Sequence, residues 1–469
     1  GCESGYIAPK PGDPEVTYAG CYGGTIGRLD RRTGQERSIH VWPDNPMGWG
    51  AEGMKYRFQW TFPIVASRHD PNVLYAAGNV LFRTTNEGQS WEAVSPDLTR
   101  NDPSKMGPSG GPITKDNTSV EYYGTIFALA ESPLDGQVLW AGSDDGLVHV
   151  TRDGGKTWSN VTPKAMPEWS RVSQVDASPH DPGTAWLAVN RYQLDDYRPY
   201  VYVTTDFGET WRAAGAGLPP ESFVRVVRED PRRRGLLFAG TETGVHVSFD
   251  AGVSWRPLQR NLPAVPVTDL VVKGDDVVLA TQGRSFWVLD DIAPLRQLTP
   301  EVAGASAHLF EPSVAYRFGG SEGRGAVGKN PPYGARFYYL LKDAPKDGEE
   351  VKLEILDEKG GLVRAFTSKE AKKGESTGPD VSSDDAPKPI PAKNEVLLRI
   401  ARIGVCGSDV HVFHGTHPYT SYPVVQGHEF SAVVEQLGES VKEVSLGQKV
   451  TAMPQIVCGE CAPCRRGDY

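Results

Sequence analysis

"TRDGGKTW", residues 151–158, is one of four copies of a phrase that recurs along the chain. Each copy follows an alternating apolar run that indicates strand, turn and strand, so we expect the phrase at the tip of a β-hairpin. Its Asp or Asn can accept hydrogen bonds from turn amides, its Gly can take a positive φ, and its Trp can cover the hairpin. We therefore predict a structural role for these side chains, not a catalytic one. The copies are "TTNEGQSW" (84–91), "TRDGGKTW" (151–158), "TTDFGETW" (204–211) and "SFDAGVSW" (248–255), with turn residues Asn86, Asp153, Asp206 and Asp250 and aromatic residues Trp91, Trp158, Trp211 and Trp255.

Two further segments, 16–35 and 277–291, have the strands without the full phrase. Six hairpin units at repeating intervals, with no convincing amphipathic helix between them, indicate radially arranged β-blades. The composition agrees, because 52 Gly and 37 Pro with 39% hydrophobic residues in a chain of 469 suit a turn-rich β protein. The sequence predicts a mainly β chain that contains an incomplete propeller over residues 1–297, truncated at its N-terminal side.

The four phrases resemble the Asp-box (BNR) repeats of β-propeller proteins. Residues 1–297 are more closely similar to bacterial proteins related to the sortilin/VPS10 N-terminal domain. Propellers of this kind include sialidases, xyloglucan-active glycosidases and peptide-binding sortilins, so the fold does not select an activity. The resemblance implies recognition of a polysaccharide or an extended peptide, with an Asp-box glycoside hydrolase as the alternative.

Long excursions between the blades are better candidates for a binding site than the turns, because inserted loops build the binding face of a propeller. In the first excursion, Trp49, Tyr56 and Trp60 look like a platform on which a sugar could stack, and Glu52 and Arg57 look like its polar rim. Aromatic rings also pack well on one another. A self-packed plug between blades is therefore an equal alternative for this segment.

Two more excursions carry charged and aromatic side chains that could face a ligand. Paired carboxylates among them could perform glycosidic acid/base chemistry, but a sequence does not give their separation. No spacing selects the arginine cluster that a sialidase needs, so we favour a binding surface over a glycosidase. The candidates are Asp116, Glu121, Tyr122 and Tyr123 in residues 107–124, and Arg191, Tyr192, Asp195 and Asp196 in residues 190–200.

The net charge and the hydropathy of the chain limit the classes of partner that we expect. The formal net charge of -10 gives no electrostatic reason to expect nucleic acid or an anionic membrane. No apolar run reaches the roughly 18 residues needed to span a bilayer, and the first residues lack the features of a signal peptide. Four of the six cysteines lie in the last 64 residues, which indicates metal-type clustering and not a disulfide framework.

After the blades the pattern changes. Residues 331–368 alternate like strands, and we predict a partial Ig-like sandwich over 298–368. "GRGAVG" (323–328) matches a dinucleotide-loop spacing, but no strand-to-helix unit surrounds it, so we reject that reading. Residues 369–390 are charged and rich in proline, which predicts a solvated linker.

The remaining residues contain "VCGSD" (405–409), "GHE" (427–429) and "CGECAPC" (458–464). Residues 386–469 resemble the N-terminal GroES-like domain of zinc-dependent medium-chain alcohol and polyol dehydrogenases, and we take the domain itself as 391–469. The resemblance implies catalytic zinc on Cys406 and His428 with Glu429 beside it, a proton-relay hydroxyl on Ser408, an outer partner in Asp409, and three of four structural zinc ligands in Cys458, Cys461 and Cys464.

This segment departs from the family pattern in several places. Ala432 stands where the family usually has Gly, the opening strand of the barrel is missing, and no Rossmann half is found to hold NAD(P). The fourth structural ligand would fall just past Tyr469. We expect a truncated fragment that binds zinc but is inactive alone, joined to the propeller by a natural fusion or by an artefact of gene assembly. The two parts also suggest different compartments, secreted or periplasmic for the propeller and cytoplasmic for the dehydrogenase part.

Overall fold

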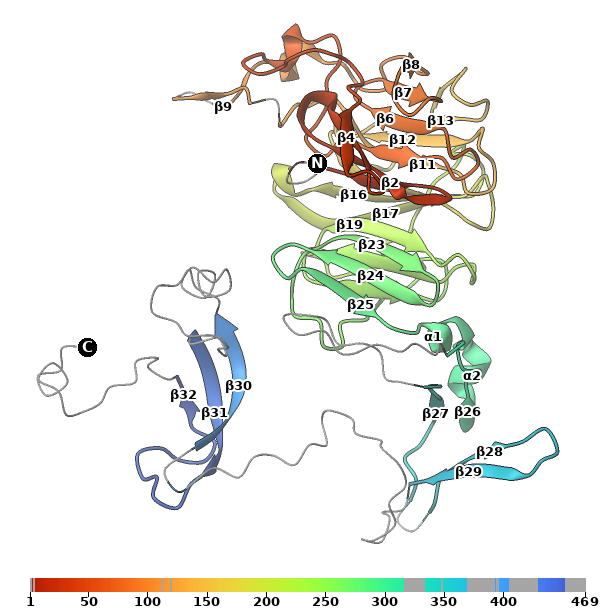
Figure 1. The fold of residues 1–469 in the computed structure, drawn as a ribbon, viewed down its shortest axis with the longest axis vertical. Helices are drawn as coiled ribbons and strands as arrows, with labels where there is room; N and C mark the ends of the chain where they lie inside the picture. The colour runs from red at the N-terminus through yellow and green to blue at the C-terminus, as the bar shows by residue number, and fades with distance from the viewer. Residues whose placement is uncertain are drawn as a thin grey trace, which may run out of the picture. The chain divides into compact units, whose positions relative to one another are not determined.

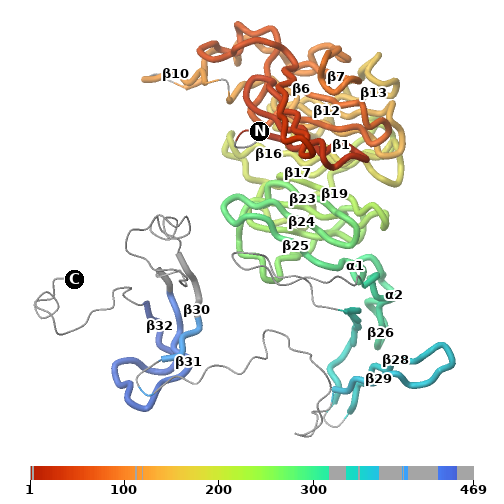
Figure 2. The backbone as a smooth tube through the Cα atoms, viewed as in Figure 1, coloured from red at the N-terminus to blue at the C-terminus, as the bar shows by residue number. Residues whose placement is uncertain are grey.

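The computed structural model describes residues 2, 5–110, 113–118, 120–315, 334–346, 349–368, 393, 396–404 and 429–451. The chain divides into two compact units, Gly1–Ala344 and Pro345–Tyr469, and each is described by itself. Figures 1 and 2 show the first unit as a series of small sheets, coloured from red near the N-terminus to green. The predicted linker lies outside the described residues.

Six antiparallel sheets follow one another along the first unit, and each is an up-and-down meander. Five have four strands and the sixth has three, as the six hairpin units of the sequence predict. The sheets are β1 (Ile7–Lys10), β2 (Asp13–Gly20), β3 (Ile26–Asp30) and β4 (Gln35–Ser38); β5 (Ile64–Ala66), β6 (Leu74–Ala77), β7 (Leu81–Thr84) and β8 (Glu92–Ala93); β11 (Ile126–Glu131), β12 (Leu139–Ser143), β13 (Val148–Thr151) and β14 (Ser159–Asn160); β15 (Arg171–Ala177), β16 (Ala185–Arg191), β17 (Asp196–Thr204) and β18 (Arg212–Ala213); β19 (Val224–Glu229), β20 (Leu237–Thr241), β21 (Val245–Ser248) and β22 (Arg256–Pro257); and β23 (Val267–Lys273), β24 (Asp276–Thr281) and β25 (Phe286–Leu289).

The first strand of each sheet faces the centre of the array. First strands of consecutive sheets contact one another, from β1 and β5 through β11, β15 and β19 to β23. Residues of β5, β11, β15, β19 and β23, together with Tyr6, line a channel of 290 Å³. A ring of meanders around a channel lined by first strands is the arrangement of a β-propeller, so the predicted fold class is confirmed.

Burial differs between the middle and the ends of the array. Every residue of β12 and β20 is buried, because a neighbouring sheet covers each face. The first and sixth sheets instead expose apolar side chains, with Ile7 at 69% and Phe286 at 75%. The first and sixth sheets therefore each keep apolar side chains open to solvent.

The repeated phrase forms the same turn four times. Asp153 Oδ1 accepts hydrogen bonds from the Thr157 amide (2.9 Å) and the Thr151 hydroxyl (2.8 Å), and its Oδ2 accepts one from the Thr157 hydroxyl (2.7 Å). The Thr157 hydrogen bonds lower the pKa of Asp153 to about 2. Gly155 follows with a φ of +94°. Equivalent bonds occur at Asn86, Asp206 and Asp250.

The tryptophan of the phrase does more than cover its own hairpin. The indole Nε1 of Trp158 donates to Val94 O (2.9 Å), and that of Trp211 donates to Val161 O (2.6 Å). Each acceptor directly follows the last strand of the preceding sheet. Trp255 repeats the contact with Ala214 O (2.7 Å). These indoles therefore fasten consecutive sheets together, a role that the sequence analysis did not predict.

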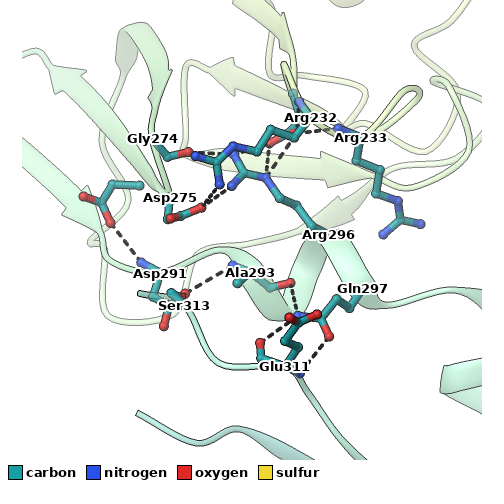
Figure 3. A network of polar contacts seen from close by, with 12 residues as sticks. Arg232, Arg233, Gly274, Asp275, Asp291, Ala293, Arg296, Gln297, Glu311 and Ser313 are labelled. Atoms are coloured by element: carbon teal, nitrogen blue, oxygen red, sulfur yellow. Dashed lines mark hydrogen bonds and ion pairs between the residues drawn. The ribbon is translucent and has the colours of Figure 1, made fainter. Parts of the chain in front are cut away.

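A polar network fastens the segment after the sixth sheet to the propeller (Figure 3). This segment holds the two α-helices of the described chain, α1 (Ala293–Gln297) and α2 (Pro300–Gly304). In α1, Arg296 contacts Asp275 and donates to Gly274 O (2.8 Å). Its Nε also lies 2.9 Å from Oδ2 of Asp230, a carboxylate with no solvent exposure. The carboxylate of Asp291 accepts a hydrogen bond from Ser313.

The described part of residues 298–368 forms two separate strand pairs. β26 (Ala307–Leu309) pairs with β27 (Tyr339–Leu341) in the first unit, and β28 (Lys352–Leu356) pairs with β29 (Leu362–Thr367) in the second. Three of these strands lie in the segment for which the sequence predicts strands. The partial Ig-like sandwich itself stays a prediction.

The second unit also contains a three-stranded sheet, β30 (Val396–Gly404), β31 (Glu429–Leu437) and β32 (Lys449–Val450). Ala432 pairs with Ile400 and Val450 and is buried. The described strands of this sheet do not close into a barrel.

The two cysteines outside the C-terminal cluster form a link that the sequence did not predict. Cys2 and Cys21 form a disulfide, with their Cα atoms 4.8 Å apart. The count of cysteines favoured the C-terminal cluster and gave no sign that these two are paired. They meet because Cys21 directly follows β2, while the backbone amide of Cys2 donates to Gly20 O (3.1 Å).

Candidate functional site

The first excursion does not form one open aromatic platform. Trp49 is 60% exposed, but Tyr56 is partly buried, with its ring edge-on to Trp42 (5.0 Å) and to Phe82 (4.9 Å). Trp60 is partly buried as well, 5.7 Å from a neighbouring tyrosine ring. The contacts of Tyr56 and Trp60 favour the self-packed plug for these two residues.

The polar residues of this excursion are divided between surface and interior. Glu52 is exposed. Arg57 is only 4% exposed, so it does not lie at a rim. Its guanidinium donates to Gly124 O (3.0 Å), Asp97 (2.9 Å) and Thr99 (3.1 Å), which ties the first excursion to the second. These contacts give Arg57 a structural role.

The second excursion packs against the first. Tyr122 is buried, and its hydroxyl contacts Pro46 O (2.9 Å) and Trp49 O (3.1 Å). Asp116 and Glu121 are exposed, and Asp116 accepts a hydrogen bond from a neighbouring threonine hydroxyl (2.6 Å). Tyr122 therefore supports the loop and does not offer its ring to a ligand.

The third excursion is organised around one carboxylate. Asp196 accepts hydrogen bonds from Arg191 (2.9 Å), from two nitrogens of Arg198 (both 2.9 Å) and from the Tyr200 hydroxyl (2.7 Å). The Arg198 hydrogen bonds are the main reason why the pKa of Asp196 lies well below its ordinary value. Asp196 is thus a permanent anion that orients Arg191.

Two further residues of the third excursion lie on η4 (Tyr192–Leu194) and at its end. The ring of Tyr192 stacks on Phe223, with centroids 4.7 Å apart and an interplanar angle of 14°. Asp195 follows η4 in the left-handed region, with a φ of +57°. Asp195 therefore ends the short helix, and it is exposed.

A cavity of 340 Å³ lies where the second and third excursions meet. Antiparallel pairing explains the place, because the start of a first strand lies opposite the end of a second strand. Ile126 of β11 pairs with Ser143 of β12, and Arg171 of β15 pairs with Asn190 of β16. Loops that enter a first strand or leave a second one therefore gather at one end of the sheets. The lining is Lys105, Tyr123, Asp144, Trp169, Arg171, Asn190, Arg191, Gln193 and Leu194.

Trp169 and Tyr123 form the aromatic wall of this cavity. Their rings are stacked, with centroids 6.5 Å apart and an interplanar angle of 27°. The indole of Trp169 also lies near two cations, 4.7 Å from Arg100 Cζ and 5.6 Å from Lys105 Nζ. Trp169 has a φ of +60°, which is rare for a bulky side chain, so its environment holds it in place.

The acidic group of the cavity is Asp144, in the turn between β12 and β13. It is 4% exposed, and it accepts hydrogen bonds from the amides of Gly124 (3.0 Å) and Thr125 (2.9 Å) and from the Thr125 hydroxyl (2.8 Å). Burial raises the pKa of Asp144 to about 7, although the Thr125 hydrogen bonds act in the opposite direction. Burial and Asp144 also raise the pKa of Tyr123. Asp144 therefore changes charge near neutral pH.

Sequence reasoning found two members of this lining, Tyr123 and Arg191, and missed the rest. Trp169 and Arg171 stand at the start of a first strand, and Asp144 stands in the turn after a second strand. The propeller topology brings such positions together. That topological rule, applied to the predicted hairpins, was the signal that could have found them.

The zinc ligands implied by resemblance cannot be placed. Cys406, Ser408, Asp409, His428, Cys458, Cys461 and Cys464 lie outside the described residues. Glu429 is the first residue of β31, and only its backbone is described. In the described part of the chain, no three His, Cys, Asp or Glu side chains gather as a metal site would require. None of the described helices is long and apolar enough to cross a membrane.

Comparison with known proteins separates the two parts of the chain. Residues 392–469 match the profile of the alcohol dehydrogenase GroES-like domain. The starvation-sensing protein RspB of Escherichia coli (strain K12) is 40% identical over 79 residues, which are 17% of this chain and 23% of that protein. The sorbitol dehydrogenase of Halalkalibacterium halodurans is 41% identical over 86 residues, 18% of this chain and 25% of that protein. The chain thus spans about a quarter of the length of the curated relatives it matches.

A solved structure resembles the propeller part in fold. The GH74 xyloglucanase from Xanthomonas campestris aligns with a TM-score of 0.42 and 17% identity, over 62% of this chain and 46% of that chain. A likeness at this level concerns fold alone.

Proposed function

We propose that the propeller binds a polysaccharide in the cavity between its second and third excursions. The observation that carries this proposal is the lining, in which Tyr123, Trp169 and Leu194 offer apolar surface beside the polar Asn190 and Gln193. Aromatic rings bury the C–H faces of sugars, while polar groups at the edge fix the orientation of a ligand. A volume of 340 Å³ lies in the range of small-ligand sites, enough for one or two sugar units of a longer polymer.

The lining supports binding more than hydrolysis. Glycosidases of the common type need two carboxyl groups, about 5 to 9.5 Å apart, across the scissile bond. Among the described residues of the lining, Asp144 is the one carboxylic acid, and its oxygens already accept hydrogen bonds from Gly124 and Thr125. The described lining therefore has no second carboxylic acid to act as the other catalytic group.

Glycan arrays and peptide arrays, probed with the full chain and with Trp169→Ala, test this proposal. We expect the full chain to bind glycans, and we expect Trp169→Ala to bind the same glycans at least tenfold more weakly. Binding to extended peptides alone would replace the polysaccharide with a peptide partner. Release of sugar from a labelled glycan would instead make the propeller a glycosidase.

The first excursion remains a second candidate platform, through the exposed ring of Trp49. A Trp49→Ala variant on the same arrays separates the two surfaces. The disulfide between Cys2 and Cys21 supports an oxidising compartment for the propeller, in keeping with a role outside the cytoplasm.

For the C-terminal part we propose zinc binding, supported by the family match and by the spacing of its cysteines. Cys458, Cys461 and Cys464 would hold a structural ion with a water as fourth donor, because tetrahedral sites need four ligands. Cys406, His428 and Glu429 would hold a second ion, which in dehydrogenases polarises the alcohol oxygen. Zinc content of the purified chain, before and after replacing the three clustered cysteines by serine, tests the first site.

Alcohol or polyol oxidation by this part is a separate proposal. We expect none from these 469 residues, because no segment of the sequence has the strand, glycine loop and helix that would hold a nicotinamide nucleotide. The same preparation, assayed with polyols and NAD or NADP, decides it. Turnover would show that the C-terminal part is active as it stands.

A further inference from the structure

The cavity carries more positive charge than its own acidic group balances. Three of its lining residues are cations, Lys105, Arg171 and Arg191, against one acid, Asp144. Arg191 is already paired with Asp196 (2.9 Å). The other two cations, Lys105 and Arg171, have no ion pair among the described residues.

Arg171 is held in place by neutral groups. Its Nη2 donates to Gln193 Oε1 (2.5 Å), its Nη1 lies 3.5 Å from the Tyr192 hydroxyl, and its Cζ lies 4.8 Å above the ring of Phe127. No ion pair involving Arg171 or Lys105 occurs among the residues that the structure describes. Lys105 is exposed, and its ammonium group lies 5.6 Å from the centre of the Trp169 ring.

The guanidinium groups also keep unused hydrogen-bonding capacity. The Nε atoms of Arg171 and Arg191 are buried and find no acceptor among the described residues. Buried donors without a partner are few in native proteins and destabilise the fold. An arginine fixed by neutral neighbours, with no ion pair among the described residues, is a preformed site for an anion, because little freedom remains to be lost when the ligand binds.

We infer that this cavity recognises a carboxylate on the sugar ring, so that the ligand is a polysaccharide containing uronic acid. The inference rests on the proposed function and names its ligand class. A guanidinium group presents N–H donors in a plane that matches a carboxylate. Arg171 would bind this group, Lys105 would add charge at the rim, and Tyr123 with Trp169 would pack on the ring.

Titration calorimetry with a galacturonic acid tetramer, using the full chain, tests the inference. A hydrogen bond to a charged group contributes about 1.5–3 kcal/mol, so we expect the methyl-esterified tetramer to bind at least about tenfold more weakly. Arg171→Gln should weaken binding of the acid by a similar factor and leave binding of the ester unchanged. Lys105→Gln, at an exposed position that folding does not need, should weaken binding of the acid about threefold.

Arg225→Gln is the matched control. Arg225 is also a partly buried arginine near an aromatic ring, 5.0 Å from Phe223, but it is paired with Glu242 (2.7 Å) and does not line the cavity. We expect it to change affinity less than twofold. Circular dichroism melting of each variant verifies that the fold is kept.

Several results would overturn the inference. Equal affinity for the acid and the ester, or an equal loss of affinity for both in Arg171→Gln, would show that the site does not recognise the carboxylate. Equal affinity for a sulfated tetramer would show that the site responds to charge alone. Tight binding of neutral tetramers would leave the proposed function standing while the inference fails. If sugars of all these kinds fail to bind, the proposed function fails with it.

Discussion

The indole hydrogen bonds between sheets predict a measurable difference among tryptophans that share one sequence motif. Trp211 donates to Val161 O across the boundary between two sheets (2.6 Å). Trp91 occupies the same position in its own copy of the phrase, but its buried Nε1 finds no acceptor among the described residues. Replacing either residue by Phe removes the N–H and a similar amount of apolar surface. Only Trp211→Phe also leaves a carbonyl oxygen unpaired.

The expected magnitude follows from this comparison. Leaving a buried acceptor unsatisfied costs about 1–3 kcal/mol, whereas removing a buried donor that has no partner relieves a penalty. We therefore expect Trp211→Phe to lower the free energy of unfolding by at least about 1 kcal/mol more than Trp91→Phe does. Trp158→Phe serves as a replicate, because Trp158 makes the same contact to Val94 O (2.9 Å).

Urea unfolding followed by circular dichroism measures the effect without relying on tryptophan fluorescence. The two substitutions cost the same apolar area to a first approximation, so their difference reports the hydrogen bond. Equal losses of stability for Trp91→Phe and Trp211→Phe would refute the reasoning. In that case the tryptophans would act through packing alone.

Three further predictions concern charge and covalent links. Burial raises the pKa of Asp144 from 3.8 to about 7, so its contribution to stability is fully present below pH 3.8 and is lost as pH rises to about 7. Asp144→Asn should remove this fall of the melting temperature with pH. Parallel melting-temperature profiles of the original protein and the variant from pH 4 to 8 would contradict the prediction. Arg296→Met should lower the free energy of unfolding in urea by about 3 kcal/mol, because it leaves the Asp230 carboxylate buried without its ion pair. A loss below about 1 kcal/mol would show that the amides of Arg232 and Arg233, which donate to Asp230 (2.8 and 2.7 Å), suffice. Cys21→Ser should cost about 3 kcal/mol by opening the loop to Cys2, and a reductant should then have no further effect on the melting temperature, whereas a persisting effect would place the sensitive bond elsewhere.

The sequence predicted the sheets well because the repeated phrase carries its own local chemistry. A Thr, an Asp and a Gly at fixed spacing can complete a turn without help from the rest of the chain, as the bonds around Asp153 show. The same independence explains why the indole contacts were missed. The acceptor of Trp211 lies 50 residues earlier, and no local pattern indicates it.

The candidate site was harder to predict for a related reason. Trp49 and Tyr56 stand close in sequence and look alike, yet one is exposed and the other packs on Phe82 of a neighbouring strand. Arg57 looked like a rim residue and is buried by partners from two other segments. Trp169 and Arg171 were not among the candidates from the sequence. Their place in a cavity depends on which strand ends meet, which is a property of the whole array.

The open surfaces of the two end sheets have a consequence for assembly. Ile7 lies on the first sheet and Phe286 on the sixth, so the two exposed apolar surfaces are different. When unlike surfaces of one molecule attract each other, copies join head to tail. Such contacts close into a ring only if the rotation per copy divides a full turn, and otherwise they continue as a filament. Association through these two surfaces would therefore give rings or filaments, depending on that rotation.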